Sequence, residues 1–95
     1  MTVKQSVITA LRLSAAAAAA LDGEIDRYIS TARAEMIRVG VDSAAAAGTG
    51  ELVTEAIVTY CCMKMGAPDR YDQYKAAWEY QINNLRRSTL TENGE

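Results

Sequence analysis

The sequence predicts an all-α fold, a small bundle of about four helices with a long C-terminal helix. Apolar residues recur at spacings of three and four along most of the chain. No segment shows the alternating pattern of a strand. A chain of 95 residues with 49% apolar and 23% charged side chains suits a single globular domain. We expect one helical domain over residues 1–88, followed by a polar tail over residues 89–95 that is flexible unless it docks to a partner.

The first two helices are predicted from about Thr2 to Leu13 and from near Asp22 to Val39. Gly40 supplies the stop of the second helix, because glycine tolerates the backbone that follows a helix C-terminus. Alanine runs cover residues 15–20 and 44–47. Alanine is the best helix former, so the first run either extends the second helix backwards or joins the first two helices. The apolar side of the second helix consists of Leu21, Ile25, Tyr28, Ile29, Ala32, Met36 and Val39.

The third helix is predicted from Glu51 to Met65 and is apolar nearly all round. One face carries Val53, Ala56, Ile57 and Tyr60, and the other carries Val58, Cys62 and Met65. Such a helix is normally buried on several sides, and this one is too short to span a bilayer. Two explanations stay open: either the chain encloses the helix by itself, or a neighbouring subunit covers part of it.

The fourth helix is predicted to begin at Pro68, which suits a first helical turn, and to reach about Ser88. An apolar stripe lies within an arc of about 80° and is expected to face the core. Its aromatic members should supply much of the buried area in a chain without Phe. The stripe consists of Tyr71, Tyr74, Trp78, Ile82 and Leu85. Tyr80 falls on the opposite side and is a candidate contact residue, since tyrosine is enriched at interfaces.

The composition argues against enzymatic activity and against bound cofactors or metals. The chain has no His, so Ser-His and Cys-His dyads are excluded, and it has no glycine-rich phosphate loop. Cys61 and Cys62 are adjacent, which suits neither an ordinary disulfide nor a zinc site. The net charge of -2 argues against a protein that binds nucleic acid by neutralising phosphates. No run of 18 strongly apolar residues predicts a membrane span, and the N-terminal stretch fits an amphipathic helix better than a signal peptide.

Three segments together resemble the tailed-bacteriophage head–tail connector family, also called adaptor or head-completion proteins. They are "LRLS" at the end of the first helix, "DGEIDRYISTARAEMIRVGV", and "ELVTEAIVTYCCMKMGAPDRYDQYKAAWEYQINNLR". The likeness runs from about Val3 to Arg87. The alanine runs depart from the family, which generally carries polar or acidic connections at those places.

The resemblance implies a structural virion protein that forms a ring between the portal and the tail or stopper proteins and extends the DNA channel. Its implied partners are further copies of itself in a dodecameric ring, the portal protein, a downstream stopper or tail-completion protein, and viral DNA that passes without sequence-specific binding. The implied location is the head–tail connector of the virion, after synthesis in the host bacterial cytoplasm. The resemblance implies no membrane partner.

The candidate contact residues of such a ring fall into two groups. The candidate subunit interface is Ile37, Val58, Cys62, Met65 and Tyr80, and the candidate portal-docking end is Arg86, Arg87 and Leu90.

Two alternatives stay open beside the connector. One is a small cytoplasmic helical adaptor or chaperone that binds a peptide in a groove. The other is a helical DNA-binding regulator with its cations on the second helix, at Arg27, Arg33 and Arg38. The acidic residues of that helix offset those cations.

Overall fold

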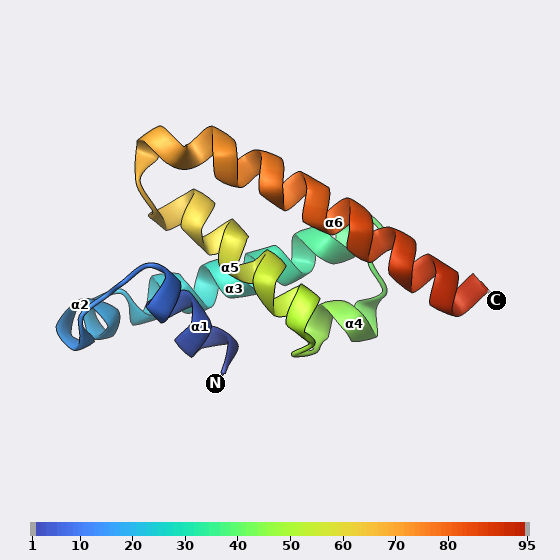
Figure 1. Ribbon diagram of the computed structural model, residues 1–95. Helices are drawn as coiled ribbons and strands as arrows, with labels where there is room; N and C mark the ends of the chain where they lie inside the picture. Colours follow the sequence, from blue (N-terminus) through green and yellow to red (C-terminus); the bar gives the residue numbers. More distant parts are fainter. Residues whose placement is uncertain (1, 95) are drawn as a thin grey trace.

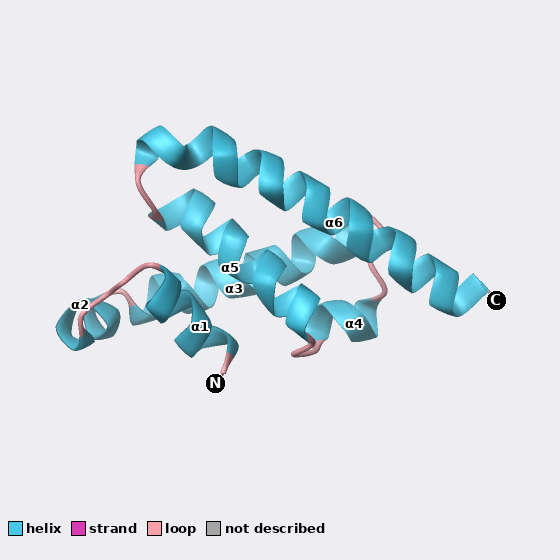
Figure 2. Ribbon diagram, viewed as in Figure 1, coloured by secondary structure: helices cyan, strands magenta, loops and turns pink. Residues whose placement is uncertain are grey.

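The computed structural model describes the backbone of residues 2–94 and the side chains of residues 2–87. This part of the chain contains six α-helices and a short 3-10 turn, without strands (Figures 1 and 2). The elements are α1 (Val3–Ala10), α2 (Ala15–Ala20), α3 (Asp22–Arg38), α4 (Ser43–Ala47), α5 (Glu51–Met65), the 3-10 turn η1 (Pro68–Arg70) and α6 (Tyr71–Gly94). The predicted all-α class and long C-terminal helix are confirmed. The four longer helices correspond to the four predicted ones, and the alanine runs add two short helices.

Helix α5 is the centre of the molecule. It packs against α1, α3 and α6, which surround most of its length (Figure 1). Seven of its side chains are buried: Val53, Ala56, Ile57, Tyr60, Cys61, Cys62 and Met63. The chain therefore encloses most of this apolar helix by itself, which favours the first of the two explanations for its composition.

The molecule is elongated because α6 reaches past the rest of the bundle. Its principal extents are 47 × 26 × 19 Å, and a helix of 24 residues is about 36 Å long. The C-terminal end of α6 lies beyond α4, while α2 and the turn between α5 and α6 lie at the opposite end (Figure 1). The helix extends past the predicted end near Ser88 to Gly94. The predicted flexibility of residues 89–95 stays a prediction.

The core stripe predicted on α6 is confirmed from Tyr74 to Leu85 and wrong at its first member, Tyr71. Trp78 and Leu85 are buried, and Tyr74 and Ile82 are half-buried. Tyr71, however, is 40% exposed. It stands in the first turn of α6 and lines two hollows beside Met63 and Lys64 of α5. The Trp78 ring instead packs on Tyr60 of α5, with 4.9 Å between ring centroids.

Helix α1 ends in a Schellman motif with an unusual residue at its left-handed position. Leu13 N–H donates to the Ile8 carbonyl and Arg12 N–H donates to the Thr9 carbonyl, at 3.2 and 3.0 Å. Arg12 has a φ of 56°, at a position where glycine is usual because it has no Cβ to clash. This motif ends α1 at Ala10, before the predicted end at Leu13.

Helix α3 ends in the same motif, with glycine in the left-handed position. Val41 N–H donates to the Met36 carbonyl at 2.9 Å, and Gly40, with a φ of 106°, donates to Ile37 at 3.1 Å. The stop predicted at Gly40 is confirmed. The side chain of Arg86 from α6 packs directly on this glycine, since a Cβ there would stand 3.0 Å from the Arg86 Cδ.

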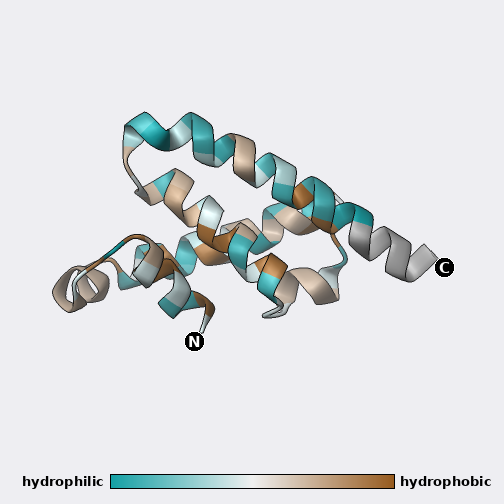
Figure 3. Ribbon diagram, viewed as in Figure 1, coloured by the Kyte–Doolittle hydropathy of each residue, from teal (hydrophilic) through white to brown (hydrophobic). Residues whose placement is uncertain are grey.

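The two alanine runs form separate short helices with polar N-caps. Ser14 accepts from Ala17 N–H at 3.1 Å at the start of α2, and Asp42 accepts from Ala45 N–H at 3.2 Å at the start of α4. In Figure 3 both helices are pale brown along their length, because alanine is only weakly hydrophobic. Of the two alternatives for residues 15–20, the backward extension of the second helix is wrong, since Leu21 has a non-helical backbone and separates α2 from α3. The run instead forms a short helix that joins α1 to α3.

An ion-pair network joins α1 to α3. The Lys4 ammonium contacts Asp22, and it lies 3.0 Å from an Asp26 carboxylate oxygen. The hydrogen bonds to these two carboxylates raise the pKa of Lys4. The acidic start of α3, which also complements the helix dipole, is thus partly used in positioning α1. None of the helices in the described part of the chain is long and apolar enough to cross a membrane.

Candidate interaction surface

The outer side of α5, between α1 and α6, is exposed over the first half of the helix. Leu52, in the first turn of α5, is 64% exposed, and Glu55 one turn later is also exposed. Val58 follows on the same side and is half-buried. Two hollows flank this strip, and Glu55 lines both.

The first hollow lies between α5 and α6 and has a volume of about 260 Å³. It is lined by Leu52, Glu55, Tyr80, Gln81, Asn84 and Leu85. Tyr80 stands at its edge with 69% of its surface exposed. The Gln81 Oε1 atom is buried and accepts no hydrogen bond from the described residues. Because an unpaired buried amide oxygen is costly, a donor arriving at this place would be favoured.

The second hollow lies between α1 and α5 and has a volume of about 460 Å³. Its lining is rich in hydroxyl groups and consists of Ser6, Thr9, Ala10, Thr49, Glu51, Thr54, Glu55 and Val58. We call the two hollows and the strip of Leu52, Glu55 and Val58 between them the α5 face. The first hollow carries the exposed Leu52 and Tyr80, and the second carries the hydroxyl groups and the Glu51 carboxylate. The face therefore has a more apolar side and a more polar side.

Two of the five residues predicted for a subunit interface, Val58 and Tyr80, lie on the α5 face. Met65 is half-buried against the core at the other end of α5 and lines neither hollow. Ile37 is 48% exposed, but it projects from α3 and also lines neither hollow. The five residues therefore do not form one continuous surface.

The structure corrects the prediction that Cys62 lies on an outer face of the third helix. Its side chain is only 6% exposed, because the end of α1 and the start of α6 close over that side of α5. It lines a hollow together with Leu11 and Tyr74. Burial raises the pKa of Cys62, and it raises that of Cys61 to about 12. Both thiols are therefore protonated near neutral pH and poorly nucleophilic.

The predicted portal-docking end is described only in part. Arg86 is exposed, and its Nη1 donates to the Val39 carbonyl at 3.5 Å, which ties α6 to the end of α3. Arg87 is exposed. The side chain of Leu90 lies outside the described residues. One of the two described cations at this end, Arg86, thus contacts its own chain.

The arginines of α3 also contact groups of their own chain. Arg33 donates from Nη1 to the carbonyl oxygens of Ala46 and Gly48, both at 2.7 Å. Arg38 pairs with Glu35 at 2.8 Å. These contacts weaken the regulator alternative, since a recognition helix needs such cations free for phosphates and bases.

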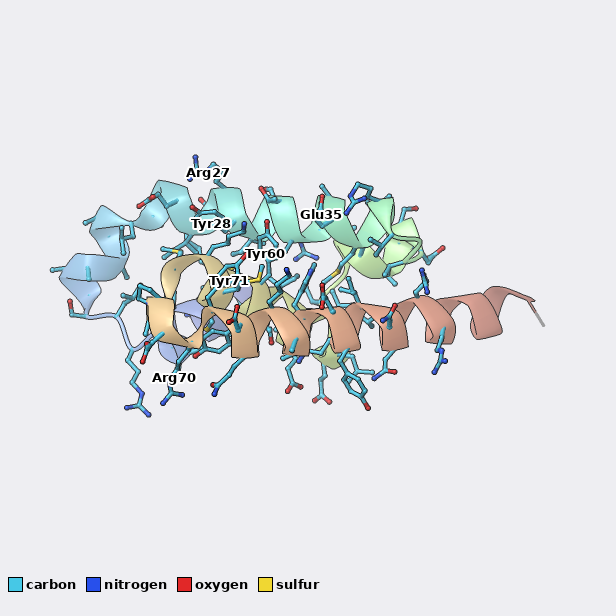
Figure 4. The ribbon with its side chains drawn as sticks, turned by 90° about the horizontal axis from the view of Figure 1, so that it is seen from above. Arg27, Tyr28, Glu35, Tyr60, Arg70 and Tyr71 are labelled. Carbon is cyan, nitrogen blue, oxygen red and sulfur yellow. The ribbon has the colours of Figure 1, made fainter. Side chains whose placement is uncertain are left out.

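The third arginine of α3 lies against an aromatic ring. The Arg27 guanidinium is 4.9 Å from the ring centroid of Tyr28, to whose hydroxyl it donates at 3.2 Å (Figure 4).

In the described part of the chain, no three Cys, Asp or Glu side chains come close enough together to hold a metal ion.

Sequence reasoning missed Leu52 as a surface residue. Helical spacing alone gives no signal for it, because Leu52 lies only about 40° around the helix from the buried Ala56.

No protein-family model matches the chain, and no curated protein or solved structure is significantly similar to it.

Proposed function

We propose that this protein is a structural subunit of a bacteriophage head–tail connector. Copies of the chain would form a ring between the portal and the stopper or tail proteins and so extend the DNA channel. Two independent lines support the proposal. One is the resemblance of the segments between Val3 and Arg87 to that family, and the other is the α5 face.

The observation that carries the proposal is the exposure of Leu52 and Tyr80 on either side of one hollow, at 64% and 69%. Fully burying a leucine side chain stabilises an association by about 1.5–3 kcal/mol, and a tyrosine adds a large rigid surface. A donor from a neighbouring copy would also satisfy the buried Gln81 oxygen. The surface is therefore suited to contact with another protein.

A closed ring needs two different faces on each subunit, because its contacts are heterologous. Ile37, 48% exposed on α3 and outside both hollows, provides a second apolar position. The net charge is -2, and Arg33 and Arg38 of α3 contact groups of their own chain. Both features suit a channel through which DNA moves without being bound.

The adaptor alternative is supported by the same hollow. An apolar cleft of about 260 Å³ between two helices is a place where an amphipathic partner helix can lie. The two functions differ in stoichiometry, since the connector forms rings of many copies and the adaptor forms a one-to-one complex.

The test compares Leu52→Lys and Tyr80→Lys with Gln73→Lys. All three add one positive charge at an exposed helical position, but Gln73 lies outside the α5 face. Sedimentation velocity from micromolar to millimolar concentration, with negative-stain imaging, should show rings for the unchanged chain and for Gln73→Lys only. Circular dichroism should show that all variants keep their helices. Rings that survive both changes on the α5 face, or an unchanged chain that is monomeric throughout, would contradict the proposal.

A further inference from the structure

A third hollow lies at the end of the molecule opposite the C-terminal end of α6. It has a volume of about 370 Å³ and sits where α1 ends, α5 ends and α6 begins. Its lining includes Leu11, Arg12, Cys62, Ala67, Arg70 and Tyr74. Two arginines that are 58 positions apart in the chain (70 − 12 = 58) thus stand at one small concave site.

Neither guanidinium has a partner in the described part of the chain. Arg12 and Arg70 are both exposed, and neither side chain makes a hydrogen bond, an ion pair or a ring contact with a described residue. In Figure 4 the Arg70 side chain points away from the bundle. The contrast is with Arg33 and Arg38, whose guanidiniums bond to groups of their own chain.

The backbone of Arg12 makes this placement costly. Its φ of 56° is the left-handed conformation that the equivalent residue of α3, Gly40, adopts without a Cβ. An arginine in this position incurs a steric penalty that glycine would avoid. Residues with strain of this kind cluster at functional sites.

We propose that Arg12 and Arg70 form a binding site for a carboxylate, the side chain of an Asp or Glu from a neighbouring protein. Guanidinium groups bind carboxylates and phosphates through paired N–H donors. Leu11, Ala67 and the buried Cys62 give the hollow an apolar lining, which suits the methylene groups of an acidic side chain. A nucleic-acid backbone needs a longer row of cations, and the chain as a whole is acidic.

A purely structural role makes a different prediction for Arg12. It stands just past the C-terminal end of α1, where a cation complements the helix dipole, so on that account removing it should lower stability and leave carboxylate binding unchanged. Arg12→Gly separates the two accounts, because it removes the guanidinium and also relieves the left-handed strain.

The experiment is an NMR titration of the full chain with blocked glutamate (acetyl-Glu-amide), with inorganic phosphate and with a single-stranded oligonucleotide. We expect blocked glutamate to shift the Arg12 and Arg70 side-chain N–H signals saturably, with a Kd of roughly 1 mM. Arg12→Gly and Arg70→Gln should each weaken that binding about tenfold, which corresponds to one lost charge-assisted contact. Arg12→Gly should also raise the urea midpoint of unfolding. Lys75→Gln, which removes an exposed charge outside the hollow, should bind like the unchanged chain.

Three results would overturn the inference: no saturable shift with blocked glutamate, equal binding by Arg12→Gly, or tighter binding of phosphate or of the oligonucleotide. The source of the carboxylate follows from sedimentation. If a second copy supplies it, Arg12→Gly weakens self-association; if another protein supplies it, self-association is unchanged while glutamate binding is lost. Leu52→Lys leaves this hollow intact, so the site and the proposed ring can fail independently.

Discussion

The guanidinium of Arg33 bonds through Nη1 to the carbonyl oxygens of both Ala46 and Gly48, at 2.7 Å each. These carbonyls lie at the C-terminal end of α4, where no further turn of helix can satisfy them. A helix of five residues is far too short to be stable in isolation. Asp42 at one end and Arg33 at the other therefore account for much of the order of the second alanine run.

Arg33→Met should destabilise the protein by about 1–3 kcal/mol, because it leaves part-buried carbonyls without their charged donor while keeping an unbranched apolar stem. Urea unfolding would measure the loss, and amide hydrogen exchange should rise first in residues 43–48. Arg38→Met removes an exposed ion pair with Glu35 and serves as the control, with little expected change. Equal effects of the two changes would contradict the assigned role of Arg33.

The two Schellman motifs predict stability changes of opposite sign. Gly40→Ala should cost about 1–2 kcal/mol, since it places a Cβ on a residue with a φ of 106° and against the Arg86 side chain. Arg12→Gly should stabilise by about 1 kcal/mol for the same steric reason. Thermal and urea unfolding would measure both. A loss of stability in Arg12→Gly would mean that the guanidinium contributes more to the fold than its backbone strain costs.

Two aromatic residues of α6 should differ strongly in their contribution to stability. Trp78→Ala should cost about 3–5 kcal/mol, because the indole is buried against Tyr60. Tyr80→Ala should change the unfolding free energy by no more than about 0.5 kcal/mol, since the ring is 69% exposed. Unfolding followed by circular dichroism measures both variants on the same scale. Similar losses in the two variants would show that Tyr80 belongs to the core.

The buried thiols predict a loss of stability at alkaline pH. The pKa of Cys61 rises from its ordinary value of 9.0 to about 12 in the folded chain, first through burial and then through Cys62. The contribution of this group is therefore complete below pH 9 and declines as the pH rises towards 12, because the unfolded state releases the proton first. Burial also raises the pKa values of Cys62 and Tyr60, with the same sign.

Urea unfolding between pH 7 and pH 11 would measure the decline, and Cys61→Ala should make it shallower. A thiol reagent at pH 8 should label both cysteines rapidly in urea and slowly in the folded chain. Rapid labelling without urea would contradict their burial.

The sequence predicted the long helices well because their signals are local. The third predicted helix, Glu51 to Met65, matches α5 in both of its bounds, since Gly66 marks its end and a continuous apolar run marks its length. A Cβ at Gly66 would collide with the Cys62 carbonyl, which explains why glycine stands at this position. Gly40 marked the end of α3 through its left-handed backbone, which is also a local signal.

The short helices and the details of the surface could not be predicted in this way. Alanine favours helix wherever it stands, so residues 15–20 gave no indication of the break at Leu21. The left-handed Arg12 contradicts the residue preference for that position. The burial of Cys62 and the exposure of Leu52 depend on which neighbours of α5 lie on each side, and that information resides in the tertiary packing.

The central position of α5 also affects how the chain folds during synthesis. Its neighbours α1 and α3 leave the ribosome before it, but Trp78 and Leu85 of α6 leave after it. Until that segment emerges, one apolar flank of the nascent α5 stays in water, where other unfinished chains can bind it. Slow translation of residues 71–85, or a shortage of chaperones at that stage, should therefore lower the yield of folded protein more than slow translation of any earlier segment.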